Sequence, residues 1–598
     1  MNKNISLPVI CLASLLILAR CGADPTATDA AYSLIRVTPE NLTSTNTYTD
    51  TYGTGYEYYM LDTAQDVNLE YTLDIGPSMK DVYFIFTNID PYSETSSPTI
   101  HKKNQPESPA AGPDPAHDLK PTAIDLNKSP ITSKIEVAEF NRDPFSFLNK
   151  LNPVSRLLNI VPSPEQRSDN ADDAGVFYDY DAKKKAFITV KATCRKVVTD
   201  GRMTLNIWVA DDCWAETGSK SILVTQEMVD TTAEKFLRSG ADNDIYDWVT
   251  NIYGQPWGGH ASPELIANEK YNNSITILLN DIDNDDASGG VLGYFWAKDN
   301  FIRKYFPYSN ERIMFYLDAI LLAKGDNPAA WNVTDSMPSQ VISTLSHEFQ
   351  HMIHFYQKTV LRTNGIGSEI WIDEMCSLAT EDLVADKLQV NGPRGIFYND
   401  PSTGQPNNRD GRLPLYNCFN EYSVTRWYGG DWSCVSYAVN FALGAYLARN
   451  FGGAAFFRDV VQNGFTDYNA VEYALARRGS QDGFSTILRK WAVSNLLSNK
   501  IDLLLNDSYK YNNSTAGFTN SIGSIKYKLG SINLYNYEYA LAGNPHAGPY
   551  IYTSIPRNPL QPASNIYFKA GTSLAGKQSW SIRMDRNVRM SVVVKDPP

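Results

Sequence analysis

The sequence predicts an α+β fold in which a central region of β-strands and helices is flanked by two β-rich regions. Three observations predict it. Residues from about 30 to 98 alternate apolar and polar positions, the middle of the chain adds long helical periodicities, and the chain after about 512 returns to alternating patches rich in Gly, Ser, Asn and Tyr. The expected divisions are a signal segment at 1–20, an N-terminal β-rich domain at 21–100, an irregular linker at 101–172, the central domain at 173–511, and a C-terminal β-rich domain at 512–598.

The flanking regions carry short strand patterns. Asn68–Ile75 and Asp81–Thr87 alternate as strands do, and Val588–Lys595 repeats the pattern near the C-terminus. The C-terminal region is expected to be a module of the β-sandwich type. Between the first β-rich region and the central domain, Pro106–Pro115 is rich in Pro and Ala, which is typical of a linker.

The central domain opens with a predicted hairpin, in which strands at Phe187–Val198 and Met203–Ala210 surround the turn 199–202. A helix at Gln226–Leu237 should follow. Further strands are expected at Ser274–Asn280, Val291–Trp296 and Arg312–Leu317, and later helices at Cys434–Phe451, Tyr468–Arg478 and Phe484–Ser498.

Composition and the N-terminus bear on location and partners. The net charge of −13 argues against nucleic acid as a partner and suits an exported protein. Lys3 and the apolar run 5–19 form an export signal that is too short to span a membrane. The signal ends in Leu-Ala-Arg-Cys-Gly, which resembles a lipoprotein cleavage site with a membrane anchor on Cys21. Arg20 departs from that pattern, so ordinary cleavage near Ala23 and secretion is the alternative.

The segment His347-Glu348-Phe349-Gln350-His351 has the spacing H-E-x-x-H. Apolar residues around it recur every three to four positions from a cap at Ser336 to Tyr356, which predicts a helix. Positions i and i+4 share one helix face, so His347 and His351 can bind one metal ion, and Glu348 can reach a water molecule beside it. The pattern predicts a zinc peptidase in which Glu348 is the general base.

A catalytic zinc ion takes three protein ligands in most enzymes. The first helical pattern breaks at Thr363–Gly367, and a second one follows at Ile370–Leu383. A short turn lets the second helix fold back along the first, so Glu374 is the expected third ligand. His354 lies about one helical turn beyond His351, too far for good tetrahedral geometry, and is expected to pack nearby. Among the other acidic residues, Glu381 is better placed than Glu369 to hold a ligand histidine by its second ring nitrogen.

These motifs resemble the hyicolysin-type bacterial metallopeptidases. The segments that carry the resemblance are H-E-F-Q-H-M-I-H-F at 347–355, W-I-D-E-M at 371–375, I-T-I-L-L-N-D-I at 275–282, G-Y-F at 293–295, S-N-E-R-I-M-F-Y-L-D at 309–318 and the helical run 487–497. The resemblance covers roughly 175–510. It implies a zincin-like domain with an active-site helix and a C-terminal helical subdomain, zinc on His347, His351 and Glu374, and Glu348 as general base. The chain departs from the pattern at His354 and at Leu378, where related enzymes place a supporting acid.

Three further features have a functional and a structural interpretation. Asp281–Asp286 has the carboxylate spacing of a calcium loop but lacks its glycine and final glutamate, so a solvated acidic loop is the alternative. Tyr437, with Tyr446 behind it, is a candidate donor to the negative charge that develops on the substrate carbonyl. Cys194 could pair with Cys213, and Cys418 with Cys434; Cys376 would then be a buried free thiol, although it could also ligate metal.

The interpretation that unites these features is an exported zinc endopeptidase acting on proteins or peptides. One alternative is a surface-binding lipoprotein on an inactive peptidase scaffold, and another is cleavage of a non-peptide amide at the same site. The sequence does not indicate an oligomeric state or a substrate preference.

Overall fold

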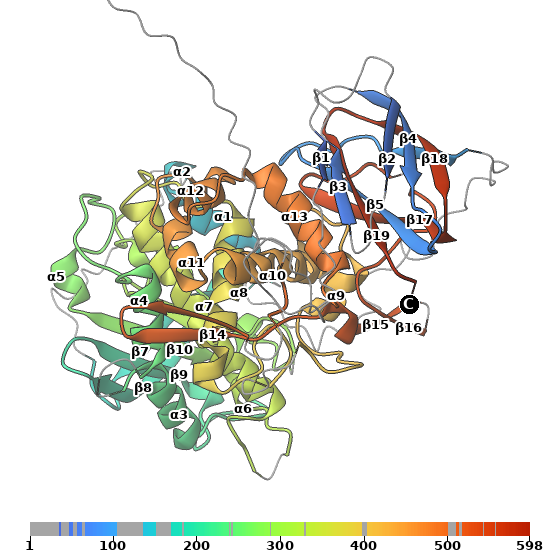
Figure 1. Cartoon of the computed structure of the whole chain (residues 1–598). Coiled ribbons are helices and arrows are strands. Elements are labelled where there is room, and N and C mark those ends of the chain that lie inside the picture. Colours follow the sequence, from blue (N-terminus) through green and yellow to red (C-terminus); the bar gives the residue numbers. More distant parts are fainter. Residues whose placement is uncertain are drawn as a thin grey trace, which may run out of the picture.

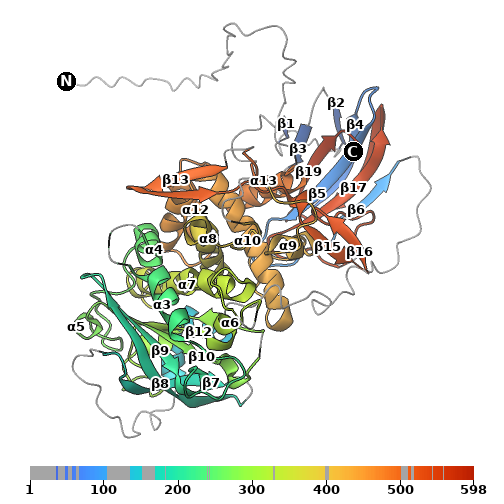
Figure 2. The same cartoon turned by 90° about the horizontal axis from the view of Figure 1, so that it is seen from below.

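The structure, a computed structural model, describes residues 35–37, 47–51, 57–61, 66–103, 135–150, 169–181, 184–238, 240, 243–287, 289–327, 330–397, 403–499, 510–513, 517–541, 543–556 and 558–597. They form an α+β fold, as predicted, in which a β-sandwich lies to one side of a larger body of sheet and helices (Figures 1 and 2). None of the helices in these ranges combines the length and the apolar character needed to cross a membrane. The predicted signal segment and Cys21 lie outside the described residues.

The larger body is built on a mixed sheet with the strand order β11-β12-β10-β9-β8-β7. Its strands are β7 (Ala174–Asp181), β8 (Ala186–Thr199), β9 (Thr204–Ala210), β10 (Ser274–Asn280), β11 (Gly293–Tyr294) and β12 (Met314–Asp318). The antiparallel pairing of β8 with β9 confirms the predicted hairpin, and β10 pairs in parallel with both β9 and β12. The strand predicted at 291–296 is shorter than expected, because the chain leaves the sheet edge for a 3₁₀ turn at Ala297–Asn300.

Helices cover the sheet and build the rest of this body. They are α3 (Gln226–Phe236), α4 (Ile245–Tyr253), α5 (Asn268–Tyr271), α6 (Ala319–Ala323), α7 (Ser336–His354), α8 (Ile370–Leu388), α9 (Leu413–Cys418), α10 (Ser433–Asn450), α11 (Ala454–Val461), α12 (Asn469–Arg477) and α13 (Phe484–Leu496). The helices predicted from Gln226, Ser336, Ile370, Cys434, Tyr468 and Phe484 are all present within one or two residues at their starts. Short helices such as α4 and α11 were not predicted.

Helix α7 is the element that organises this body. Its N-cap is Asp335, one residue before the predicted cap, and its buried stripe includes Val341, Leu345 and Phe349. The helix continues as a π-helical segment at Phe355–Val360. The chain then reverses at Gly365, whose φ of +95° is a backbone conformation that L side chains rarely adopt, and this reversal returns α8 alongside α7.

The two flanking β-rich regions, predicted as separate domains, combine in one sandwich. One sheet has the order β1-β3-β19-β5-β17 and the other β2-β4-β18-β6, so in each sheet a C-terminal strand, β19 or β18, lies between N-terminal strands. The strands are β1 (Ile35–Val37), β2 (Thr47–Thr51), β3 (Glu57–Leu61), β4 (Val67–Asp74), β5 (Lys80–Asn88), β6 (Thr99–Lys102), β17 (Ser564–Leu574), β18 (Lys577–Met584) and β19 (Val588–Lys595). Tyr71, Phe84 and Trp580 pack between the sheets.

Burial explains why the two regions combine. Both faces of β5 are buried: Phe84 faces the sandwich core, whereas Tyr83 and Ile85 pack against Val493 and Leu496 of α13. The strands of one region alone would leave such faces in water, and pairing with the other region buries them. The sandwich is therefore attached to the helical body through α13.

Two other predicted segments contain elements that the sequence analysis did not expect there. Helices α1 (Ile135–Arg142) and α2 (Pro144–Lys150) lie in the segment predicted as an irregular linker, and they pack on the helical body. The hairpins β13–β14 (Phe518–Ile522, Ile525–Leu529) and β15–β16 (Glu538–Leu541, Asn544–Ala547), placed in the C-terminal domain by the sequence, also contact this body. Tyr527 Oη, for example, donates to the carbonyl oxygen of Trp248 at 2.7 Å.

The proposed disulfides are absent, because the five described cysteines are free and buried. The register of the β8–β9 hairpin places Cys194 opposite Trp208, whereas Cys213 follows the end of β9. Cys434 Sγ instead donates to the carbonyl oxygen of Asp431 at 2.8 Å. Cys376 is a buried free thiol, as predicted, and burial raises its pKa well above the usual value.

Candidate metal centre

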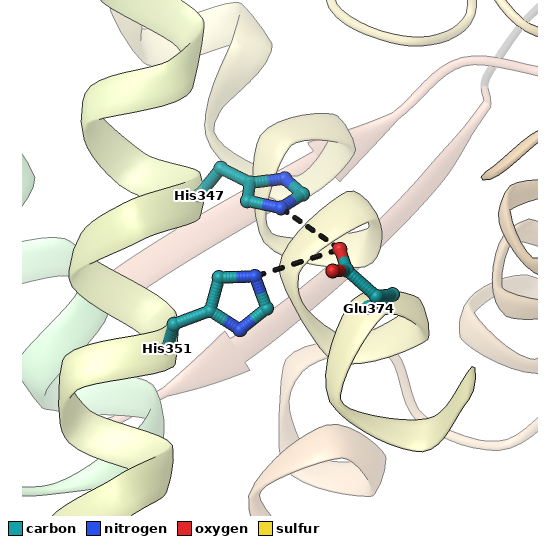
Figure 3. A group of neighbouring side chains, drawn as sticks. All are labelled: His347, His351 and Glu374. Atoms are coloured by element: carbon teal, nitrogen blue, oxygen red, sulfur yellow. Dashed lines mark hydrogen bonds and ion pairs between the residues drawn. The ribbon is translucent and has the colours of Figure 1, made fainter. Parts of the chain in front are cut away.

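His347 and His351 project from successive turns of α7 toward Glu374 on α8 (Figure 3). Glu374 Oε2 lies 3.2 Å from His347 Nε2 and 3.5 Å from His351 Nε2. One ligand atom from each of the three residues lies within 4.8 Å of the others. Within the described ranges, no other group of three His, Cys, Asp or Glu side chains meets in this way.

The two separations measured from Glu374 Oε2 fit a zinc ion. In a tetrahedral zinc site with bonds of about 2.0–2.1 Å, neighbouring ligand atoms lie roughly 3.3–3.4 Å apart. The two distances from Glu374 Oε2 to the imidazole nitrogens bracket that value. Two imidazoles and one carboxylate are also the set that catalytic zinc accepts while keeping a fourth position open.

The other ring nitrogen of each histidine lies next to a carboxylate oxygen. His347 Nδ1 lies 2.8 Å from Glu381 Oε1, which is the contact predicted for Glu381. Ser343 Oγ donates to the second oxygen of Glu381 at 2.7 Å. His351 Nδ1 lies 2.9 Å from Asp373 Oδ1. These contacts fix the ring orientation and leave each Nε2 facing Glu374, as a pair of metal ligands requires.

The imidazoles of His347 and His351 and the carboxylate of Glu374 shift one another's pKa values. Burial lowers the pKa of His347, but its contacts with Glu374 and Glu381 outweigh burial and raise that pKa to about 9. Burial raises the pKa of Glu374, yet His351 and His347 hold it at about 2. Without an ion, protons on the imidazoles would neutralise the carboxylates, so a metal ion must displace these protons to bind.

Glu348 lies beside the three converging side chains. Its Oε2 accepts a hydrogen bond of 2.7 Å from the backbone N–H of Phe295, and its Oε1 has no hydrogen-bond partner among the described residues. Complete burial raises the pKa of Glu348 to about 7. A carboxylate with one fixed oxygen, one free oxygen and a pKa near neutrality can take up and release a proton.

Tyr437 comes from α10 and reaches the same group. Its hydroxyl donates to Glu374 Oε1 at 3.3 Å, and its ring packs edge-on against Trp427 with the guanidinium of Arg412 on its face. Tyr446, the second predicted candidate, packs with Phe451 and Tyr511 instead. The structure therefore brings Tyr437 to the centre and gives Tyr446 a place in the core.

His354 and Glu369, the other candidate metal ligands, lie outside the group of three. His354 Nδ1 is 2.9 Å from Asp373 Oδ1 and its Nε2 is 2.9 Å from Ser368 Oγ, so this histidine packs beside the group as predicted. Glu369 precedes α8 and accepts a hydrogen bond from Trp371 Nε1. Neither belongs to the group that could hold an ion.

Asp373 is the residue that the sequence analysis missed. Its Oδ1 lies 2.9 Å from Nδ1 of both His351 and His354, so one carboxylate bridges two histidines of α7. The available signal was its position next to Glu374 combined with the three-residue spacing of the histidines. Leu378, the position where the resemblance led us to expect a supporting acid, is buried and carries no charge.

The acidic loop predicted as a calcium candidate is held by local contacts. Asp281 accepts the backbone N–H groups of Asp285 and Asp286 and lies 2.6 Å from Lys220 Nζ. Asp286 accepts the N–H and hydroxyl groups of Ser221. These carboxylates face separate partners instead of one point, which agrees with the acidic-loop interpretation and lends no support to calcium.

Comparison with known proteins agrees with this geometry. The family model described as "Peptidase M30" matches residues 188–519. A curated relative, "Neutral metalloprotease ShpI" from Staphylococcus hyicus, is 25% identical over 287 residues. That alignment spans 47% of this chain and 54% of the relative, so the similarity extends over about half the relative's length.

Proposed function

The chain belongs to the peptidase M30 family, and on this premise we propose that it is a zinc-dependent endopeptidase that hydrolyses protein or peptide substrates. The membership confirms the hyicolysin-type family named from the sequence motifs. The observation that carries the proposal is the convergence of His347, His351 and Glu374, in which Glu374 Oε2 lies at zinc-like distances of 3.2 Å and 3.5 Å from the two Nε2 atoms.

In this proposal His347, His351 and Glu374 hold the ion, while Glu381 and Asp373 orient the two imidazoles. When bound, zinc supplies a Lewis acid that polarises a carbonyl group and lowers the pKa of water. Glu348 takes one proton from the attacking water as its oxygen adds to the carbonyl carbon. The same carboxyl group passes the proton to the nitrogen as the C–N bond breaks, so that a carboxylic acid and an amine are released.

We assign to Tyr437 the role of hydrogen-bond donor to the negatively charged oxygen of the tetrahedral intermediate. Its hydroxyl lies beside Glu374 Oε1, hence near the ligand group but on a different helix from the general base. A hydroxyl held in a buried site by Trp427 needs little reorganisation when charge develops, which is the physical basis of such stabilisation.

The test is metal analysis combined with an assay. The purified protein should contain close to one zinc per chain and cleave an unstructured protein such as casein, and a chelator should abolish cleavage. His351→Ala should lose most of the zinc, whereas Glu369→Gln should keep it because Glu369 contacts Trp371 and not the group. Full zinc retention in His351→Ala would overturn the ligand assignment. Zinc without amide hydrolysis would favour an inactive surface-binding protein.

We propose that the protein works outside the cytoplasm, anchored through lipid on Cys21 or secreted. Support comes from the sequence: Lys3, the apolar run 5–19 and the Cys-Gly pair at 21–22.

A further inference from the structure

The proposed catalytic group is closed to solvent. The exposed fraction is 0% for His347, 0% for Glu348, 1% for Glu374 and 6% for His351. The hollow beside the group is lined in part by helix α1, through Val137, Ala138, Asn141 and Arg142. With α1 in this position, the hollow that adjoins His351 and Glu374 is closed on that side.

Helix α1 also occupies the edge of the sheet. Strand β11 is the edge strand, and the chain continues from it through Phe295 to Ala297. Asn141 Nδ2 donates to the carbonyl oxygen of Phe295 at 2.8 Å, and the N–H of Ala297 donates to Asn141 Oδ1 at 2.8 Å. Such C=O and N–H groups at an open edge are the ones that an added strand pairs with. The side-chain amide of Asn141 thus pairs with both the carbonyl of Phe295 and the N–H of Ala297, as the backbone of a bound peptide would.

The same edge segment adjoins the proposed general base. The N–H of Phe295 donates to Glu348 Oε2, so the residue paired with Asn141 through its carbonyl also contacts Glu348 through its amide. A peptide paired at this edge would run directly beside the proposed catalytic carboxyl group.

A second contact holds α1 from the other side of the hollow. The N–H of Gly367, in the loop before α8, donates to the carbonyl oxygen of Arg142 at 2.7 Å. A Cβ atom at Gly367 would lie 2.9 Å from the carbonyl oxygen of Asn141 and 3.1 Å from Cα of Arg142, so only glycine permits this approach. Apolar packing completes the attachment: Phe140 meets the rings of Trp296, Phe301 and Phe306.

We propose that helix α1 is an internal inhibitor, which occupies with Asn141 the backbone groups that pair with an extended peptide substrate. The proposal rests on the proposed function for the identity of the substrate. Release of α1 from the edge opens the hollow and frees the carbonyl of Phe295 and the N–H of Ala297. Binding of peptide and docking of α1 are then mutually exclusive.

Two substitutions should release α1 by different means. Asn141→Leu keeps the size of the side chain and removes both hydrogen bonds, each of which contributes about a factor of five to the docked population. Gly367→Ala pushes the end of α1 away without backbone strain, since no left-handed φ is required at this position. Each should raise kcat/KM for casein by roughly 10–30-fold, mainly through a lower KM.

Two control substitutions distinguish the release of α1 from a general loss of stability. Glu139→Ala changes an exposed side chain on the same helix, and Gly259→Ala adds a Cβ where no atom lies within 4 Å. Both should behave as the unsubstituted protein does. Thermal melts establish that all four variants are folded.

Binding must be measured apart from catalysis. In a Glu348→Gln background, anisotropy of fluorescein-labelled casein should show about ten-fold tighter binding when Asn141→Leu is added. Unchanged or weaker binding in folded Asn141→Leu and Gly367→Ala variants would overturn the proposal, because α1 would then be a permanent wall of the cleft. Tighter binding on addition of Asn141→Leu, together with no casein cleavage by the protein that retains Glu348, would support the inhibitory role of α1 and refute the endopeptidase function.

Discussion

His347 Nδ1 lies 2.8 Å from Glu381 Oε1, although the two residues are 34 positions apart in the chain. The contact joins the first histidine of the H-E-x-x-H segment to a carboxylate two helical turns beyond Glu374. Because Glu381 lies on the same helix as Glu374, α8 carries both a proposed ligand and the support of another ligand.

Glu381→Gln should weaken zinc binding without abolishing it. The substitution removes the negative charge that makes His347 a better ligand, while an amide oxygen can still accept from Nδ1. Zinc affinity should fall by about ten-fold, at the lower end of the range for such supporting residues. Competition with a fluorescent chelator measures it, and Glu369→Gln is the control on the same helix region. Equal affinities in both variants would contradict the supporting role.

Glu348→Gln should separate metal binding from catalysis. The variant keeps the shape of the side chain and the contact with the N–H of Phe295, but it loses the basic oxygen. Activity on casein should fall by about 10²–10⁴-fold while zinc content and thermal stability stay normal. Loss of zinc together with activity would show that Glu348 is a ligand.

Tyr437→Phe should lower kcat at saturating zinc by about 10²–10³-fold if its hydroxyl stabilises the intermediate, with little change in KM. Tyr446→Phe is the control, because that ring packs against Tyr511 and Phe451. A normal kcat with weaker zinc binding would mean that Tyr437 only orients Glu374.

The metal-free protein should lose stability as the pH rises from about 6.5 to about 9. An unfolded histidine has a pKa of about 6.5, and in the folded protein contacts with Glu374 and Glu381 raise the pKa of His347 to about 9 despite burial. The folded state therefore binds the proton more tightly, and this advantage is complete below about 6.5 and disappears above about 9.

Zinc requires neutral imidazoles, so its stabilising effect should grow over the same pH interval. Thermal melts with and without a chelator from pH 6 to 9 measure both trends. In chelated His347→Asn the alkaline decrease should be smaller than in the unsubstituted protein. An identical decrease in the two proteins would assign it to other groups.

Cys21→Ser should remove the membrane anchor. The unsubstituted protein should incorporate labelled fatty acid and partition into detergent, and the variant should do neither. An unlabelled mature protein that starts near Asp24 would show instead that Arg20 directs ordinary cleavage.

Much of the proposed site follows from local spacing. His351 follows His347 by four positions, about one helical turn, so the spacing alone places both side chains on one face of the helix. The turn at Gly365 and the apolar pattern after Ile370 brought Glu374 into consideration. The site was predictable to this extent because its members lie on two consecutive helices.

Other contacts were not accessible to local patterns. Asn141 reaches Phe295 from a segment that composition assigned to a linker, and nothing in its neighbours indicates that target. Cys194 and Cys213 flank a hairpin, yet the register sets Cys194 against Trp208. Register and long-range pairing depend on the surfaces that segments present to one another, and periodicity does not report them.

The sequence by itself determined the α+β class, the peptidase family and the two helices that carry His347, His351 and Glu374, because helical periodicity and the H-E-x-x-H spacing act within a few turns. The tertiary structure alone decided that β5 and β19 pair although about 500 residues separate them, and that Asn141 of α1 contacts the sheet edge next to Glu348. Burial of apolar faces drives both associations, and that free energy depends on which distant surfaces fit together.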